Sequence, residues 1–161
     1  MIFFQILIFI VSIVLISISF SGFGKLLSSN SNKYFFLNVL LGYLIISSII
    51  TLFHFFFKIN LFLSVIIFTL GLLFFFYNNK INFFSFLKVK NIHYVVIILL
   101  LIPIYLSQKY HEDFGYYHLP YAIGLIEEKI IFGFANIDKP YVYNSIWLNL
   151  YSIFFLSDKN F

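Results

Sequence analysis

The sequence contains no cysteine, no arginine and no acidic residue before Glu112. Without cysteine, the chain forms neither disulfides nor thiolate metal sites. Charged residues make up only 10% of the chain and hydrophobic residues 62%, which leaves too little polar surface for a soluble domain of this length. We therefore expect an integral membrane protein whose main partner is the lipid bilayer.

The ten basic residues are all lysines, and most stand singly between apolar runs. A surface that binds nucleic acid needs basic residues gathered on one face or along one helix. We therefore expect no nucleic-acid partner, and we interpret the lysines as signals of membrane orientation.

The apolar runs predict an all-α fold, because about 30 Å of hydrocarbon is crossed by about 20 apolar residues in a helix. We expect a polytopic bundle of four to five spans within a single membrane domain over residues 1–161. Because the last run is short, we expect the chain to be the N-terminal part of a longer protein. The predicted spans are residues 2–20, 35–57, 59–77, 92–107 and 141–156.

The segments between these runs predict how the helices are connected. Residues 21–34 contain two glycines and a Ser/Asn cluster, which favours a solvated turn that ends the first helix at Phe20. Lys58 and Asn60 predict a tight turn between the second and third runs. The mixed lysines and aromatic residues of 78–91 are typical of a segment at the membrane surface.

The external loop predicted at residues 108–140 differs in composition from everything before it, since it holds five of the six acidic residues. Lysine counts of five against four in alternate loops favour placing this loop outside the cell. Pro120 predicts the first turn of a short helix whose apolar face carries Ile123, Ile126 and Ile130. We expect the protein in a bacterial inner membrane.

Glu112 and Asp113 form an acidic pair directly after a predicted span, beside tyrosines and histidines. Such carboxylates can act as a general base or hold a hard divalent cation, Mg²⁺ or Mn²⁺. The alternative is the solvated end of a helix within an ordinary belt of aromatic residues. The spacing of these residues leaves both interpretations open.

The run from Asp113 to Leu119, followed by Gly133-Phe-Ala-Asn136 and by Asn144-Ser-Ile-Trp147, resembles a group of bacterial membrane proteins near the multi-pass glycosyltransferases. Those enzymes use sugars carried on lipid phosphates. The resemblance covers residues 108–150. It implies that Asp113 is the catalytic base or metal-associated acid and that Glu112 supports it. It further implies substrate-binding roles for Tyr117, His118, Asn136 and Asn144.

The resulting hypothesis is a membrane glycosyltransferase, or part of one, that moves a sugar from a polyprenyl-phosphate donor in cell-envelope glycan synthesis. The alternatives are a transporter or export component and a non-catalytic assembly protein. Two further side chains have an open interpretation. His54 suits either a proton relay or the membrane interface, and Trp147 suits either an interfacial anchor or a stacking platform.

Overall fold

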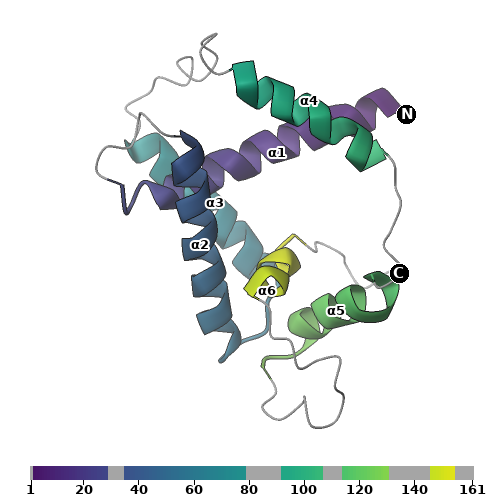
Figure 1. Cartoon of the computed structure of the whole chain (residues 1–161). Coiled ribbons are helices and arrows are strands. Elements are labelled where there is room, and N and C mark those ends of the chain that lie inside the picture. The colour runs from purple at the N-terminus through teal and green to yellow at the C-terminus, as the bar shows by residue number, and fades with distance from the viewer. Residues whose placement is uncertain (1, 29–34, 79–91, 107–113, 131–145, 155–161) are drawn as a thin grey trace.

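The computed structural model describes residues 2–28, 35–78, 92–106, 114–130 and 146–154, and every regular element within these ranges is helical. The predicted all-α fold is thereby confirmed for the described part of the chain (Figure 1). The elements are α1 (Ile2–Gly24), α2 (Phe35–His54), α3 (Leu61–Asn78), α4 (Ile92–Leu106), the π-helical segment η3 (Phe114–His118), α5 (Leu119–Glu127) and α6 (Ile146–Ser152).

The first helix is longer than predicted, because α1 continues to Gly24 instead of ending at Phe20. The prediction of a solvated turn from residue 21 was wrong: Ser21 is fully buried and Lys25 is nearly so. The small residues that suggested a turn serve instead to bring helices close together. Local propensity is here overridden by packing against α2 and α3.

Glycines make the contact between α1, α2 and α3 so close that a β-carbon would collide with a neighbouring backbone. At Gly42 it would meet the carbonyl oxygen of Phe20, and at Gly22 the carbonyl oxygen of Gly71. At Gly24 it would meet the backbone of Asn38. Small residues at helix crossings are typical of membrane bundles, where packing rather than the hydrophobic effect holds helices together.

The predicted hairpin of the second and third runs is confirmed as α2 and α3, joined by a turn at residues 55–60. We call these residues the hairpin turn. The backbone N–H groups of Phe56 and Phe57 both donate to the carbonyl of Phe53, which tightens the end of α2. Asn60 caps α3, since its side-chain oxygen accepts the N–H of Leu63 at 2.9 Å. The turn begins three residues earlier than predicted because of this tightening.

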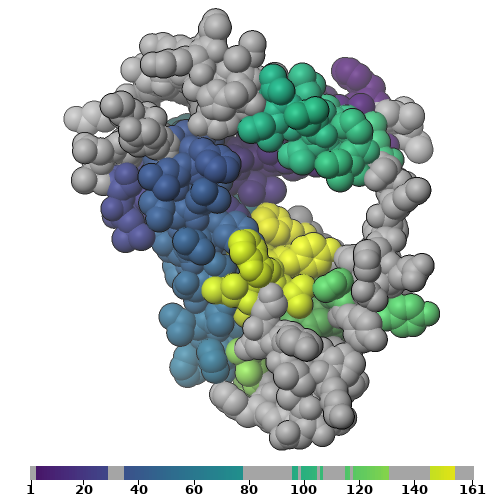
Figure 2. Space-filling view, viewed as in Figure 1, coloured from purple at the N-terminus to yellow at the C-terminus, as the bar shows by residue number. Residues whose placement is uncertain are grey.

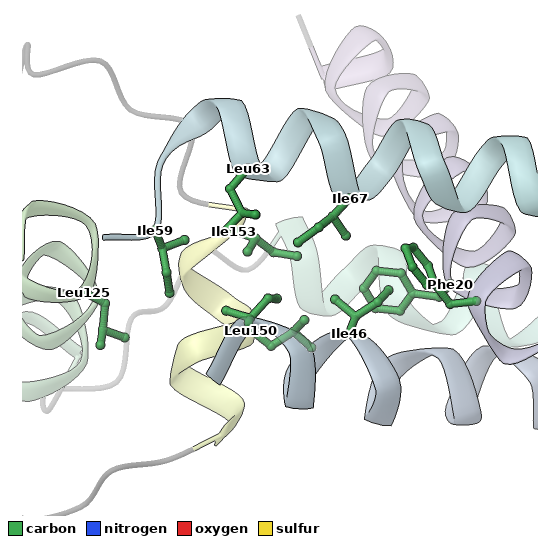
Figure 3. Packing of buried hydrophobic residues seen from close by; sticks show 10 residues of the cluster. Phe20, Ile46, Ile59, Leu63, Ile67, Leu125, Leu150 and Ile153 are labelled. Atoms are coloured by element: carbon green, nitrogen blue, oxygen red, sulfur yellow. The ribbon is translucent and has the colours of Figure 1, made fainter. Parts of the chain in front are cut away.

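A second cluster of contacts surrounds α6, which lies against α2 and α5. Leu150 and Ile153 point from α6 toward Ile46 on α2 and Leu63 on α3, and Leu125 reaches the same cluster from α5 (Figure 3). Of the predicted run 141–156 the structure describes residues 146–154, and seven of these form α6, which extends about 10 Å. The fifth predicted span reaches beyond the described residues at both ends.

Large apolar side chains cover much of the surface. Phe3, Phe4 and Leu7 in the N-terminal half of α1 are exposed, as are Leu100 and Ile104 on α4. Figure 2 shows an opening between the surface of α4 and that of α6. Two helices, Phe3–Gly24 and Phe35–His54, are long and apolar enough to cross a membrane.

Candidate functional site

Only part of the predicted site lies within the described residues. Glu112, Asp113, Asn136 and Asn144 lie outside them. The backbone of Tyr117 belongs to η3, and His118 is the last residue of that segment, with an exposed side chain. The structure therefore positions the segment that directly follows the acidic pair but does not describe the pair.

The helix predicted at Pro120 is confirmed as α5, with Pro120 in its first turn. Its buried residues are Ala122 and Leu125, whereas Ile123 is exposed and Ile130 lies beyond the end of the helix. The predicted apolar face of isoleucines was therefore wrong. Ala122 is fully buried, and a small side chain at a buried position lets α5 pack closely on its neighbours.

Two main-chain hydrogen bonds tie α5 and the residues after it to the hairpin turn. The N–H of Ile59 donates to the carbonyl of Leu125 at 3.2 Å, and the N–H of Ile130 donates to the carbonyl of His54 at 3.1 Å. Ile59 is buried beside Leu125 in the same cluster. The pair of bonds, which we call the α5 clamp, fixes the segment after the acidic pair at one end of the α2–α3 hairpin.

His54 is buried at the centre of the clamp. Its Nδ1 lies 3.3 Å from the carbonyl oxygen of Phe57. Because a carbonyl only accepts hydrogen bonds, Nδ1 must carry the proton. His54 thus closes the hairpin turn from inside, a role that neither sequence-based interpretation included.

An open apolar groove of about 380 Å³ runs between α2, η3 and α6. Tyr43 comes from α2 and His118 from η3, while α6 and Phe154, two residues after it, supply the rest of the lining. The rings of Tyr43 and Trp147 lie 4.7 Å apart, centroid to centroid. The lining from α6 and beyond consists of Trp147, Leu148, Leu150, Tyr151 and Phe154.

Polar side chains are buried between α2 and α6. The amide nitrogen of Asn149 donates to the hydroxyl of Thr51 at 3.1 Å, and that hydroxyl donates to the carbonyl of Ser47. The side-chain oxygen of Asn149 is buried and has no hydrogen-bond partner among the residues that the structure describes. A buried oxygen of this kind destabilises the folded state unless another group donates a hydrogen bond to it.

Ionisable groups in the described residues do not form a metal site, since no three histidine, aspartate or glutamate side chains gather there. Burial raises the pKa of the Tyr121 hydroxyl on α5, because the phenolate loses solvation. Burial likewise lowers the pKa of Lys25 at the end of α1, where its ammonium lies 4.7 Å from the ring centroid of Phe75.

The residues of the groove were largely missed by sequence reasoning. Tyr43 is a single tyrosine inside an apolar run and Asn149 a single asparagine inside another, and a lone polar residue in such a run is the only available signal. Trp147 was noticed, and the structure gives it an aromatic contact with Tyr43 near the middle of α2.

Comparison with known proteins identifies the family. No curated protein and no solved structure matches the chain. A family described as "Domain of unknown function (DUF8201)" matches residues 1–160. The match extends over the helices, the α5 clamp and the groove alike, and the chain therefore belongs to the DUF8201 family.

Proposed function

We propose that this protein is embedded in a membrane through at least four helices. The supporting observation is the exposure of its two longest apolar helices: only 17% of the most apolar window of α1 and 28% of that of α2 is buried. The core helix of a soluble protein buries most of its apolar surface, whereas a membrane helix exposes it to lipid. Lipid around the bundle would cover this surface.

The α5 clamp supports a crossing by α4. The third helix starts at the hairpin turn and ends at Asn78, at the opposite end of the hairpin, yet α5 is bonded to the turn. The chain must therefore return between residues 79 and 113, and α4 is the apolar helix described there. With fifteen residues, α4 is about 22 Å long and would need its flanking residues to complete a span.

The same bonds support a common side for the hairpin turn and the loop of residues 108–140. Lys58 in the turn and Lys129 after α5 are both exposed. Lysines in short loops favour the cytoplasmic side, and the loops at the opposite ends of α2 and α3 hold more lysines than the loops on the side of the hairpin turn. We propose that this loop faces outward from a bacterial inner membrane.

For the activity, we propose a membrane glycosyltransferase, or part of one, that takes its sugar from a polyprenyl-phosphate donor. The observation that supports this proposal is the α5 clamp, because it holds the segment after Glu112 and Asp113 at the hairpin turn, where the proposed spans meet the membrane surface. A carboxylate there would meet both a lipid-borne phosphate and a water-soluble acceptor.

In this proposal Asp113 is the base that removes the proton from the acceptor hydroxyl as the sugar–phosphate bond breaks, and Glu112 supports it. Tyr117, His118, Asn136 and Asn144 contact the substrates. A Mg²⁺ or Mn²⁺ ion beside Asp113 would neutralise the phosphate leaving group.

The direct test is Asp113→Asn in the full-length protein, assayed for transfer of a labelled lipid-linked sugar in proteoliposomes. Loss of a general base lowers the rate about 10²- to 10⁴-fold. Glu127→Gln is the matched control, because Glu127 is an exposed acid in the last turn of α5 and has no proposed role. Equal transfer by the Asp113→Asn variant and the wild type would remove Asp113 from the chemistry.

A transport component is the second candidate, and the hydrogen bond between the buried Asn149 and the half-buried Thr51 favours it. Transporters place polar groups within the membrane to bind their substrates. If Asn149→Leu abolished export of the glycan while Asp113→Asn left it intact, transport would replace glycosyl transfer as the proposed function.

A further inference from the structure

We propose that the groove between α2, η3 and α6 is a binding site for one acyl chain of a bilayer phospholipid. This inference rests on the membrane location proposed above and is independent of glycosyl transfer. Its basis is the groove's position, its lining and its volume.

The position of the groove corresponds to the hydrocarbon region. Tyr43 forms one wall, about 12 Å from the start of α2 and about 16 Å from its end at 1.5 Å per residue. If α2 spans the bilayer, Tyr43 lies close to the midplane, whereas His118 comes from the loop proposed on the outer face, so the groove extends from that face toward the midplane. A groove that extends into the hydrocarbon region is reached from the lipid.

The lining matches an apolar chain and not a sugar. Aromatic and leucine side chains form the whole lining apart from His118, and its exposed surface is almost entirely carbon. A sugar ring stacked on Trp147 would leave its hydroxyls without partners, which costs more than the stacking contributes. A hydrocarbon chain makes only dispersion contacts and requires no partner.

The volume matches much of one acyl chain. A methylene group is about the size of a water molecule, on the order of 30 Å³, so 380 Å³ holds on the order of a dozen methylenes. A long polyprenyl chain carries several times as many carbons, so most of it would lie outside the groove.

The rings keep the groove open. Phe154 packs on Phe68, which lies outside the groove, with ring centroids 5.6 Å apart, and the lining rings of Trp147 and Tyr43 contact each other. Trp147 nevertheless keeps 59% of its surface exposed. Like the other exposed apolar side chains, Trp147 would be covered by lipid, and in the groove an acyl chain supplies that contact.

Trp147 is the only tryptophan of the chain, so its fluorescence reports on the groove directly. The whole chain would be reconstituted in phosphatidylcholine vesicles with increasing fractions of the same lipid brominated either at mid-chain or near the headgroup. Bromine quenches a tryptophan that it contacts. We expect mid-chain bromine to quench more strongly, and to reach half of its maximal effect at a low mole fraction of brominated lipid.

Leu148→Phe fills the groove, since Leu148 lines it. Half-maximal quenching should then require about a tenfold higher fraction of brominated lipid, the change expected when one apolar contact site is lost. The matched control is Leu44→Phe, which adds the same bulk at a neighbouring exposed position of α2 outside the groove. The control should behave as the wild type. The wild-type titration is decisive by itself if Leu148→Phe fails to fold.

Three results would overturn the proposal. Stronger quenching by bromine near the headgroup would put Trp147 at the interface. Quenching strictly proportional to the brominated fraction would indicate ordinary surrounding lipid and no site. Release of quenching by stoichiometric polyprenyl phosphate would make that lipid the occupant, and would at the same time support the proposed glycosyltransferase. If the protein proved not to transfer sugars, saturable quenching by mid-chain bromine would still support the acyl-chain site.

Discussion

The two sides of α2 differ in how they meet their neighbours. Toward α1, Gly42 lets the backbones touch, and nothing fits between the helices. Toward α6, Tyr43 presents a ring to Trp147, and an open groove remains. Adjacent residues of one helix thus make a closed contact on one side and an open one on the other. The closed side holds the bundle, and the open side leaves room for a ligand.

The physical cause is the size of the residues at each contact. Glycine and serine allow two regular helices to approach along several turns, so that contacts repeat with the helix period. On the other side, α6 has only seven residues, and its large rings cannot fill the space beside a longer helix. Predictions that alter either side test this distinction.

The largest effect is expected where the contact is closed. Gly42→Leu would force α1 and α2 apart, because even a β-carbon at this position collides with the carbonyl of Phe20. We expect a loss of more than about 3 kcal/mol of unfolding free energy, measured by thermal unfolding in detergent. Gly124→Leu on α5 is the control, since a β-carbon there meets nothing within 4 Å. If both variants lost the same unfolding free energy, the close contact between α1 and α2 at Gly42 would be contradicted.

A smaller effect is expected on the open side. Leu150→Ala removes the α6 side chain that inserts between α2 and α3 (Figure 3). Truncating such a leucine costs about 2–3 kcal/mol. Because α6 carries Trp147, its release should change tryptophan emission before the rest of the helices unfold. In Leu44→Ala, where the exposed leucine packs on no core residue, emission should stay as in the wild type.

A third effect concerns the α5 clamp. His54→Ala removes the hydrogen bond from Nδ1 to the carbonyl of Phe57, at a cost of about 0.5–1.5 kcal/mol. Amide exchange at Ile59 and Ile130, the two donors of the clamp, should accelerate. Phe56→Ala serves as a control in the same turn, because that side chain is exposed. Unchanged exchange in His54→Ala would show that the clamp does not depend on the histidine.

The smallest effect is a pH dependence on the closed side. Burial lowers the pKa of Lys25 below its usual 10.5, so the unfolded chain binds this proton more tightly than the folded one. The contribution of Lys25 to stability should therefore rise with pH between its folded pKa and 10.5. Lys25→Met removes this titration. The unfolding free energy of the wild type minus that of Lys25→Met should therefore increase with pH. A decrease would contradict the burial of Lys25.

The hydropathy pattern was sufficient to predict the helical class and the α2–α3 hairpin, and Pro120 was sufficient to predict the start of α5. It failed at residues 21–24, because Gly22 and Gly24 suit both a turn and a close helix crossing, and only the partner helix decides between them. The groove was beyond prediction for a related reason. Tyr43 and Trp147 are about a hundred residues apart, and no local pattern indicates that they meet.

The central claim is that the hairpin turn and α5 lie on the same outer face of the membrane, opposite the linker after α1. The chain has no cysteine, so single cysteines at Lys58, Glu127 and Ser28 can each be labelled alone. A membrane-impermeant maleimide applied to intact cells should label positions 58 and 127 and should reach position 28 only after permeabilisation. Labelling of 58 and 127 from opposite sides would contradict the α5 clamp and the topology built on it.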